Sequence, residues 1–228
     1  MAFRCIIFIC PLLLLSCASN SQQYHIERAN QFVISGDNAS AAAEFEEALK
    51  IDAPNPPSLW QLRMVTGDCY TRMKEYEKAL KHYEAAEAVM KSDYENFRKL
   101  AGTEENGDRK IEYLEIIQRR ILPWRALSCV AQARTYCALG KDKAFSLAAE
   151  LALIYDQRNL VARLLFARSL EKTGDYDRAL KEWTTFLAQA RNTPPAEREA
   201  SGITEKEMSE AEDRMADLLS RQAEESTP

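Results

Sequence analysis

The feature that most constrains this chain is an internal repeat in which a small residue precedes an aromatic residue by four positions. It occurs in three segments, as Ala41 with Phe45, Ala79 with Tyr83, and Ala179 with Trp183. Residues four apart lie on the same face of a helix, so each pair forms part of one apolar stripe. A helix pair with such a stripe leaves one flank uncovered until the next pair packs on it. The repeat therefore predicts a stack of similar helical units.

A short turn divides each of four repeated segments into two helical blocks. The segments begin at Arg28, Thr66, Ala131 and Leu165, and their turns are Gly36-Asp37, Lys74-Glu75, Gly140-Lys141 and Gly174-Asp175. Glycine favours such a turn because it adopts left-handed backbone angles without steric cost. The chain has only seven glycines and is rich in alanine, leucine, glutamate and lysine. This composition favours an all-α fold.

The first helical block carries a second pattern in three of the segments, a small residue three positions before an aromatic. The pairs are Ala29 with Phe32, Gly67 with Tyr70, and Ala133 with Tyr136. Together with the turns and the alanine–aromatic pairs, this pattern resembles the tetratricopeptide repeat. Gly140 and Gly174 lie 34 residues apart, which is the period of that repeat. The resemblance covers residues 22–93 and 124–193, and implies an all-α solenoid of antiparallel helix pairs. An unrelated helical bundle is the alternative.

Residues 94–123 form an insertion between the two pairs of repeats. Within it, AGTEENGD (101–108) predicts a loop, and RKIEYLEIIQRRIL (109–122) predicts an amphipathic helix that Pro123 interrupts. The apolar face of this helix would consist of Ile111, Leu114, Ile117 and Leu122.

A last helix is expected over residues 204–222, where Thr204 and Glu207 have the spacing of a capping box. Its apolar side would consist of Met208, Ala211, Met215, Leu218 and Leu219. Such a helix would cover the exposed end of the stack, and residues 223–228 would form a frayed tail.

The N-terminus combines Arg4 with an apolar run of about eleven residues that ends at Leu15. A membrane-spanning helix needs roughly 20 apolar residues, so the run indicates a secretory signal. Its last residues, Leu14, Leu15 and Ser16 before Cys17, resemble the bacterial lipobox. The resemblance implies removal of residues 1–16, lipidation of Cys17, and a short tether over residues 17–23. An ordinary signal cleaved after Ala18 is the alternative.

Charge and motifs argue against several functions. The formal net charge of −5 becomes −6 when Arg4 leaves with the signal. The sequence also lacks the run of basic residues that would indicate nucleic-acid binding. His25 and His82 do not have metal-ligand spacing, and neither a phosphate-binding loop nor a nucleophile motif occurs. We therefore expect no catalytic residues, no metal and no cofactor. Apart from Cys17, the mature chain has three cysteines: Cys69, Cys129 and Cys137. We expect them to be small buried apolar side chains, and a single disulfide among them is the alternative.

The resemblance also implies a binding groove along the first helix of each pair. Seven residues take the corresponding positions: Asn30, Asp68, Arg72, Arg134, Arg168, Glu171 and Lys172. Some relatives use asparagine and basic residues there to hold the terminal carboxylate of a peptide. The expected partner is thus a protein or peptide that is acidic or binds through its C-terminus. The alternative is that these are ordinary solvated charges.

These observations favour a lipid-anchored scaffold or adaptor that binds a protein partner in the bacterial cell envelope. Ala18 and Ser19 follow Cys17 without an aspartate, and similarity to enterobacterial lipoproteins then implies the outer membrane, facing the periplasm. One alternative is a secreted, soluble periplasmic peptide-binding protein without lipid. Another is an accessory subunit of an envelope enzyme.

Overall fold

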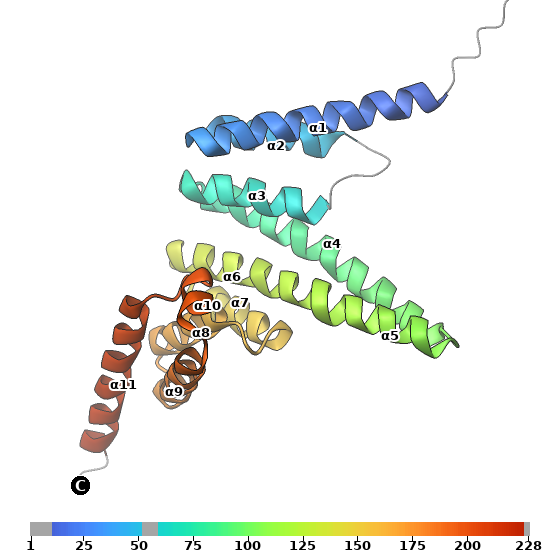
Figure 1. Cartoon of the computed structure of the whole chain (residues 1–228). Coiled ribbons are helices and arrows are strands. Elements are labelled where there is room, and N and C mark those ends of the chain that lie inside the picture. Colours follow the sequence, from blue (N-terminus) through green and yellow to red (C-terminus); the bar gives the residue numbers. More distant parts are fainter. Residues whose placement is uncertain (1–10, 52–58, 226–228) are drawn as a thin grey trace, which may run out of the picture. The chain divides into compact units, whose positions relative to one another are not determined.

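A computed structural model describes the backbone of residues 11–51 and 59–225, and the side chains of residues 21–51 and 59–224. Every regular element in these ranges is a helix (Figure 1), which confirms the predicted all-α fold. The chain divides into two compact units, residues 1–86 and residues 87–228. Helix α4 (Tyr76–Thr103) contributes residues to both units.

The first unit contains α1 (Pro11–Ser35), α2 (Asn38–Lys50), α3 (Leu59–Arg72) and the start of α4. Helix α2 packs against α1 and α3. The predicted alanine–aromatic pairs lie in its core, where Ala41, Phe45, Ala79 and Tyr83 are all buried. The spacing in the sequence therefore identified the buried face of these helices.

Gly67 shows why a small residue precedes Tyr70 in α3. A Cβ atom at this position would lie 2.5 Å from Cε1 of Tyr83, far closer than packed carbon atoms approach. The absence of a side chain lets α3 come close to the Tyr83 ring on α4. The Tyr83 hydroxyl donates a hydrogen bond to Asp68 Oδ1 at 2.8 Å, which ties the two helices together.

The second unit continues α4 and adds seven α-helices and one π-helical turn. In chain order these are α5 (Gly107–Ile116), the π-helical turn Ile117–Ile121, α6 (Leu122–Ala138), α7 (Asp142–Tyr155), α8 (Leu160–Thr173), α9 (Tyr176–Asn192), α10 (Pro195–Ala200) and α11 (Glu205–Glu225). Neighbouring helices pack in succession from α6 to α9, and α11 packs against α9. Phe145, Trp183 and Phe186 are almost completely buried in this core.

Left-handed backbone angles occur in the turn of each predicted repeat. Gly36, Gly140 and Gly174 have φ values of 81°, 67° and 81°, and Lys74 has φ 63° in the corresponding turn. The turns are also closed by equivalent hydrogen bonds. Lys74 N donates to the carbonyl oxygen of Thr71, and Gly174 N donates in the same way to the carbonyl oxygen of Glu171. Lys74 therefore occupies a glycine position and carries the steric cost of a Cβ atom there.

The insertion differs from the predicted loop followed by a separate helix. Ala101 is buried within the last turns of α4, which ends at Thr103, and Gly107 already begins α5. The side chain of Asn106 starts α5 by accepting hydrogen bonds from the backbone of Asp108 and Arg109. The predicted loop of eight residues is therefore only residues 104–106.

Pro123 does not interrupt the helix, contrary to the prediction. The chain stays helical from α5 through the π-helical turn into α6, with Pro123 in the first turn of α6. A proline lacks the backbone donor and clashes with the preceding turn of a regular helix. Here the preceding turn is the wider π-helical turn, which lies just before Pro123. The continuity of the helix thus depends on a local change of hydrogen bonding that periodicity does not reveal.

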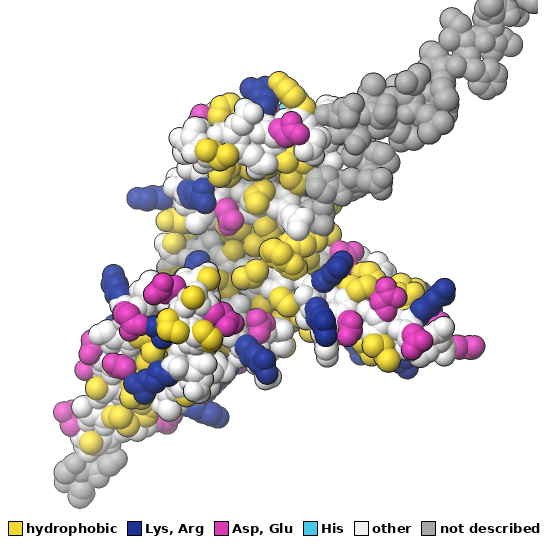
Figure 2. Space-filling model, viewed as in Figure 1, with side chains coloured by type: hydrophobic (Ala, Val, Ile, Leu, Met, Phe, Trp, Pro, Cys, Tyr) yellow, Lys and Arg dark blue, Asp and Glu magenta, His cyan; other side chains and the backbone are white. Residues whose placement is uncertain are grey.

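The predicted apolar face of α5 is only partly buried. Ile117 is buried, but Ile111 and Leu114 are exposed by 58% and 45%. Figure 2 shows apolar side chains of the α4–α5 hairpin in the open, among charges of both signs. Burial fails at this end because two helices alone cannot cover both flanks of the pair.

The C-terminal helix α11 begins as the capping box predicts. Thr204 N donates to Glu207 Oε2 at 3.0 Å, and Lys206 N donates to Thr204 Oγ1 at 3.2 Å. The helix continues to Glu225, so residues 223–225 of the expected frayed tail are helical, and residues 226–228 lie outside the described residues. Leu219 is half exposed, and does not join Met208, Ala211 and Leu218 in the core.

The predicted tether at residues 17–23 lies within α1. Gln22 is buried, and its side chain donates to the carbonyl oxygen of Ala48 at 3.0 Å. Burial and this hydrogen bond stabilise a helical segment where the sequence predicts a short polar tether. Residues 1–10 of the proposed signal, and the side chains of Leu14, Leu15, Ser16 and Cys17, lie outside the described residues.

Candidate functional site

The seven predicted groove residues fall in both units. Asn30, Asp68 and Arg72 lie on α1 and α3 in the first unit, and all three are exposed. The second unit holds the others on α6 and α8: Arg134, Arg168, Glu171 and Lys172. Each set must therefore be considered as part of its own unit.

Helix α11 binds to two of the predicted groove residues on α8. The guanidinium of Arg168 donates two hydrogen bonds to Glu210 of α11, at 3.0 and 2.6 Å. Glu171 accepts a 2.6 Å hydrogen bond from the buried indole of Trp183 and lies 3.9 Å from Arg214 of α11. Arg168 and Glu171 thus hold the chain's own helices together, and they are not available to a ligand while α11 is in place.

Lys172 has a local partner as well. Its ammonium lies 3.3 Å from Asp142 at the start of α7, and the hydrogen bond to Asp142 is the largest contribution raising the pKa of Lys172. Among the described residues, Arg134 is the one predicted groove residue of this unit for which the structure shows no ion pair. It is exposed and lies on the wall of a cleft.

This cleft has a volume of about 840 Å³, within the range of pockets that bind ligands. We call it the α6–α10 cleft. Its lining residues come from α6, from the connection between α7 and α8 with the start of α8, and from α9 and α10: Leu127, Val130, Arg134, Asp156, Arg158, Asn159, Leu160, Val161, Thr185, Ala188, Gln189, Asn192, Thr193, Pro194, Glu197, Ala200 and Ser201.

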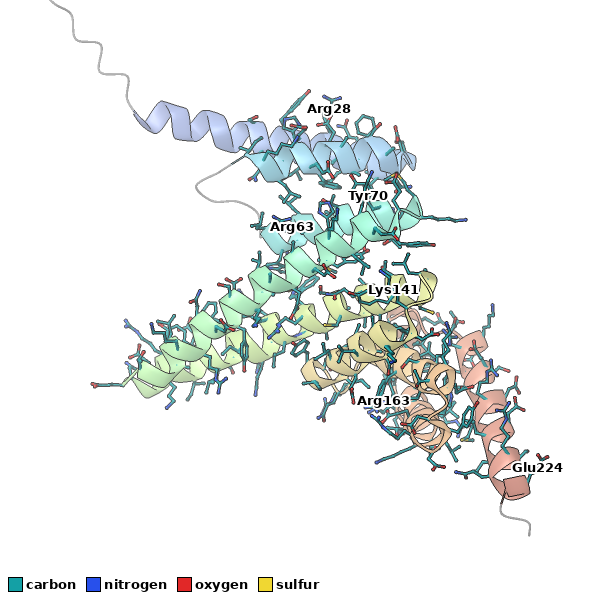
Figure 3. The ribbon with its side chains drawn as sticks, turned by 180° about the vertical axis from the view of Figure 1, so that it is seen from behind. Arg28, Arg63, Tyr70, Lys141, Arg163 and Glu224 are labelled. Carbon is teal, nitrogen blue, oxygen red and sulfur yellow. The ribbon has the colours of Figure 1, made fainter. Side chains whose placement is uncertain are left out.

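Arg163 fixes the walls of the α6–α10 cleft. Its guanidinium pairs with Glu182 and donates to the side-chain oxygen of Gln189 on α9 at 2.9 Å. It also donates to the carbonyl oxygen of Gln157 at 2.9 Å, in the connection between α7 and α8. Figure 3 shows Arg163 beside the α8 and α9 ribbons. One half-buried arginine therefore joins three elements that contribute to the cleft.

Two acidic residues of the cleft have local structural roles. Asp156 accepts a hydrogen bond from the backbone of Arg158 at 3.0 Å, and so stabilises the turn before α8. Glu197 lies in the first turn of α10, where a negative side chain interacts favourably with the helix dipole. Asn159 in turn caps α8 by accepting from the backbone of Ala162.

Comparison with known proteins agrees with the repeat architecture. Residues 26–93 match the family model described as tetratricopeptide repeat. A search of curated proteins finds no match to this chain. The crystal structure of MamA protein superposes with a TM-score of 0.52 at 10% identity, covering 92% of this chain and 98% of that one. The fold is of the tetratricopeptide-repeat type.

A second solved structure gives a similar comparison. YrrB, described as a TPR protein with an unusual peptide-binding site, superposes with a TM-score of 0.49 at 18% identity. The match covers 85% of this chain and 84% of that one. At 10% identity the likeness to MamA concerns the fold alone. Stacked repeats of this type commonly provide extended surfaces for binding proteins.

The cysteines of this tetratricopeptide-type fold differ in burial. Cys69 and Cys129 are buried, and Cys137 is half-buried. Burial raises the pKa of the Cys129 thiol to about 12, so this residue is neutral and unreactive at physiological pH. The two buried cysteines occupy helical core positions, as expected for small apolar side chains.

The histidines also have structural surroundings. The imidazole of His82 stacks on the ring of Tyr70 at 5.5 Å, and burial lowers the pKa of His82. Tyr70 itself lies between α2 and α3 (Figure 3) and donates to Glu46 at 2.6 Å. His25 contacts Glu44 at 2.6 Å. Within the described ranges, no group of three or more His, Cys, Asp or Glu side chains could hold a metal ion.

Among the helices that the structure describes, none is both long and apolar enough to span a bilayer.

Proposed function

We propose that this protein is a lipid-anchored adaptor of the bacterial cell envelope, which binds a polypeptide partner through its tetratricopeptide-type repeats. The observation that carries the binding role is the α6–α10 cleft, on which the predicted groove residue Arg134 stands. Stacked helix pairs provide rigid walls for such a cleft, and its size is that of a ligand site.

The proposed anchor is the N-terminal Cys17, which follows Leu14, Leu15 and Ser16. The thiol of this cysteine would form a thioether with a lipid. More than one acyl chain would then hold the protein stably, since a single chain gives only marginal binding to a bilayer. The proposed location is the outer membrane, with the repeats facing the periplasm.

Mass spectrometry of the mature N-terminus tests the anchor. We expect a chain that begins at Cys17 and carries acyl groups, and we expect Cys17→Ser to release the protein from the membrane fraction. A chain that begins at Ser19 without lipid would instead establish the soluble periplasmic protein. That alternative has its own support in the small residues Ser16 and Ala18, which fit an ordinary signal exit.

Crosslinking in intact cells tests the binding role. A photo-reactive side chain would replace Leu127 in the cleft, and in a matched variant would replace Ile154 on α7, which is apolar and 65% exposed but does not line the cleft. We expect a protein adduct from position 127 and none of the same mass from position 154. Equal adducts at both positions, or none at position 127, would contradict the proposed site.

A further inference from the structure

Side chains from three helices meet at one end of the second unit. They are Cys137 near the end of α6, Asp142 at the start of α7, and Lys172 near the end of α8. The ammonium nitrogen of Lys172 lies 3.7 Å from the sulfur of Cys137 and 3.3 Å from Oδ1 of Asp142. Lys141, labelled in Figure 3, marks the turn between α6 and α7. The amine and the thiol are 35 positions apart along the chain, so the packing of α6 against α8 brings them together.

Two further contacts hold the Lys172 ammonium beside this thiol. The ammonium lies 5.7 Å from the ring centroid of Phe145, and Phe145 itself is almost completely buried. It also donates to Asp142. An amine held next to a sulfur atom has a high effective concentration for a reaction between the two, because the reacting atoms already lie near the distance of attack.

Cys137 differs in accessibility from the two buried cysteines of the described chain. Cys69 and Cys129 are 2% and 3% exposed, whereas Cys137 is half-buried. Burial raises the pKa of both buried thiols, which keeps them in the unreactive neutral form. Access to solvent and a neighbouring cation are the features that make a cysteine susceptible to oxidation. Of these three cysteines, Cys137 is the one that has both.

We propose that oxidation joins Cys137 to Lys172 through a covalent bond between Sγ and Nζ. The oxidant is hydrogen peroxide. In the first step the thiolate of Cys137 attacks one peroxide oxygen, and two electrons pass from the sulfur to the peroxide. The S–O bond forms, the O–O bond breaks, and hydroxide leaves, which gives a sulfenic acid on Cys137.

In the second step the amine of Lys172 displaces the hydroxyl group of the sulfenic acid. The ammonium first loses a proton, for which Asp142 is the hydrogen-bonded acceptor, and the free electron pair on nitrogen then attacks sulfur. The N–S bond forms, the S–O bond breaks, and the hydroxyl group leaves as water with a second proton from nitrogen. A backbone nitrogen condenses with a sulfenic acid in the same way. One thiol, one ammonium and one peroxide thus give one N–S link, two waters and one proton.

The link changes the second unit in two ways. It joins α6 to α8, and so closes a loop of the chain and stabilises the folded state as a disulfide does. It also removes the positive charge of Lys172, one of the predicted groove residues, because a nitrogen bound to sulfur is no longer an ammonium. This inference does not depend on the proposed binding role or on the proposed anchor.

Mass spectrometry of the complete purified protein after treatment with hydrogen peroxide tests the link. Trypsin leaves Cys137 in residues 135–141, and it leaves Lys172 within residues 169–178 when cleavage at the modified lysine is blocked. We expect these two peptides joined, at the sum of their masses less two hydrogen atoms, and we expect dithiothreitol to separate them.

Several products would overturn the proposal. These are a sulfenic or sulfinic acid on Cys137 without a link, and a Cys137 that peroxide leaves unchanged. A link from Cys137 to another lysine would overturn the assignment to Lys172. A linked pair that retains one oxygen would overturn the direct nitrogen–sulfur bond.

Lys172→Arg separates the link from the oxidation of sulfur. The guanidinium keeps the positive charge, but it stays protonated and has no free electron pair with which to attack sulfur. We expect this variant to form the sulfenic acid on Cys137, trapped as its adduct with a 1,3-diketone, and no linked pair. The matched control, Lys141→Arg, makes the same change at an exposed lysine of the neighbouring turn and should still link. An equal loss of the link in both variants would overturn the role of Lys172.

Thermal unfolding measures the effect on the fold. Peroxide should raise the melting midpoint by about 5 °C or more relative to Cys137→Ser treated in the same way, because a link across 35 positions removes loop-closure entropy from the unfolded chain. The Cys137→Ser control carries the same methionines, so their oxidation affects both proteins equally. A linked protein whose midpoint is unchanged or lower than that of the control would overturn the stabilising role.

Discussion

Two helix pairs of the second unit use similar amphipathic sequences with opposite results. In the pair α8–α9, Trp183 and Phe186 are completely buried, because α7 packs on one side and α11 on the other. In the hairpin of α4 and α5, Leu100, Ile111 and Leu114 are exposed by 45%, 58% and 45%. The difference shows that a helical stripe indicates which residues can be buried, and a third packed element decides whether they are.

The largest effect is expected from Trp183→Ala in the buried pair. Trp183 has no exposed surface, its ring lies 6.1 Å from that of Phe186, and its indole donates to Glu171. Removing it leaves a cavity and deletes one hydrogen bond to Glu171, so we expect the free energy of unfolding to fall by about 4 kcal/mol in urea denaturation. The matched change in the hairpin, Tyr113→Ala, should cost less than about 1.5 kcal/mol. Equal costs would show that the hairpin is as well packed as α8–α9.

The comparison explains what could be predicted of the fold. The alanine–aromatic spacing identified the buried residues Ala79, Tyr83, Ala179 and Trp183, because helix geometry links sequence distance to one face. The exposure of Ile111 could not be predicted, since its spacing is as regular as theirs and only tertiary neighbours distinguish the two cases.

The second-largest effect is expected where the hairpin joins the repeats. Arg125 of α6 is buried, donates to Glu87 of α4 at 2.9 and 2.6 Å, and lies over the ring of Tyr155 at 4.2 Å. Glu87→Gln leaves this guanidinium without its countercharge, so we expect a loss of about 3 kcal/mol.

The double change Glu87→Leu with Arg125→Met separates charge from packing. An apolar pair removes both desolvated charges, and should recover most of the stability that Glu87→Gln loses. If Glu87→Gln unfolds like the unchanged protein in urea, the ion pair does not hold the hairpin to α6.

An effect of about 1 kcal/mol is expected in the turns that begin α9 and α4. Gly174→Ala introduces a Cβ atom at φ 81° and should destabilise by about 1 kcal/mol. Lys74→Gly removes the Cβ atom from φ 63° and should stabilise by roughly 0.5 kcal/mol, because the greater freedom of glycine in the unfolded chain offsets part of the gain. Thermal melts of the two variants should therefore shift in opposite directions, and shifts of the same sign would contradict the equivalence of the turns.

The residues that line the cleft were less predictable than the core. Arg134 occupies a position that repeat periodicity identifies, and the structure places it on the α6–α10 cleft. Arg158 lies in a connection between repeats, where no periodicity applies, so its presence on the cleft requires the three-dimensional structure. Arg168 fits the same periodicity as Arg134, yet its partner Glu210 lies 42 residues further along the chain. Sequence spacing could not reveal that a later helix pairs with it.

The smallest effect is expected from Ile111→Ser with Leu114→Ser in the exposed hairpin. Both side chains keep much of their surface in solvent, so little burial is lost, and surface substitutions of this kind usually change stability by less than about 0.5 kcal/mol each. Urea denaturation at two protein concentrations measures the effect. A loss above about 2 kcal/mol that disappears on dilution would show that a second copy covers these residues in solution. A loss of that size at every concentration would place them in the core of a single chain, and the contrast between the two helix pairs would then be wrong.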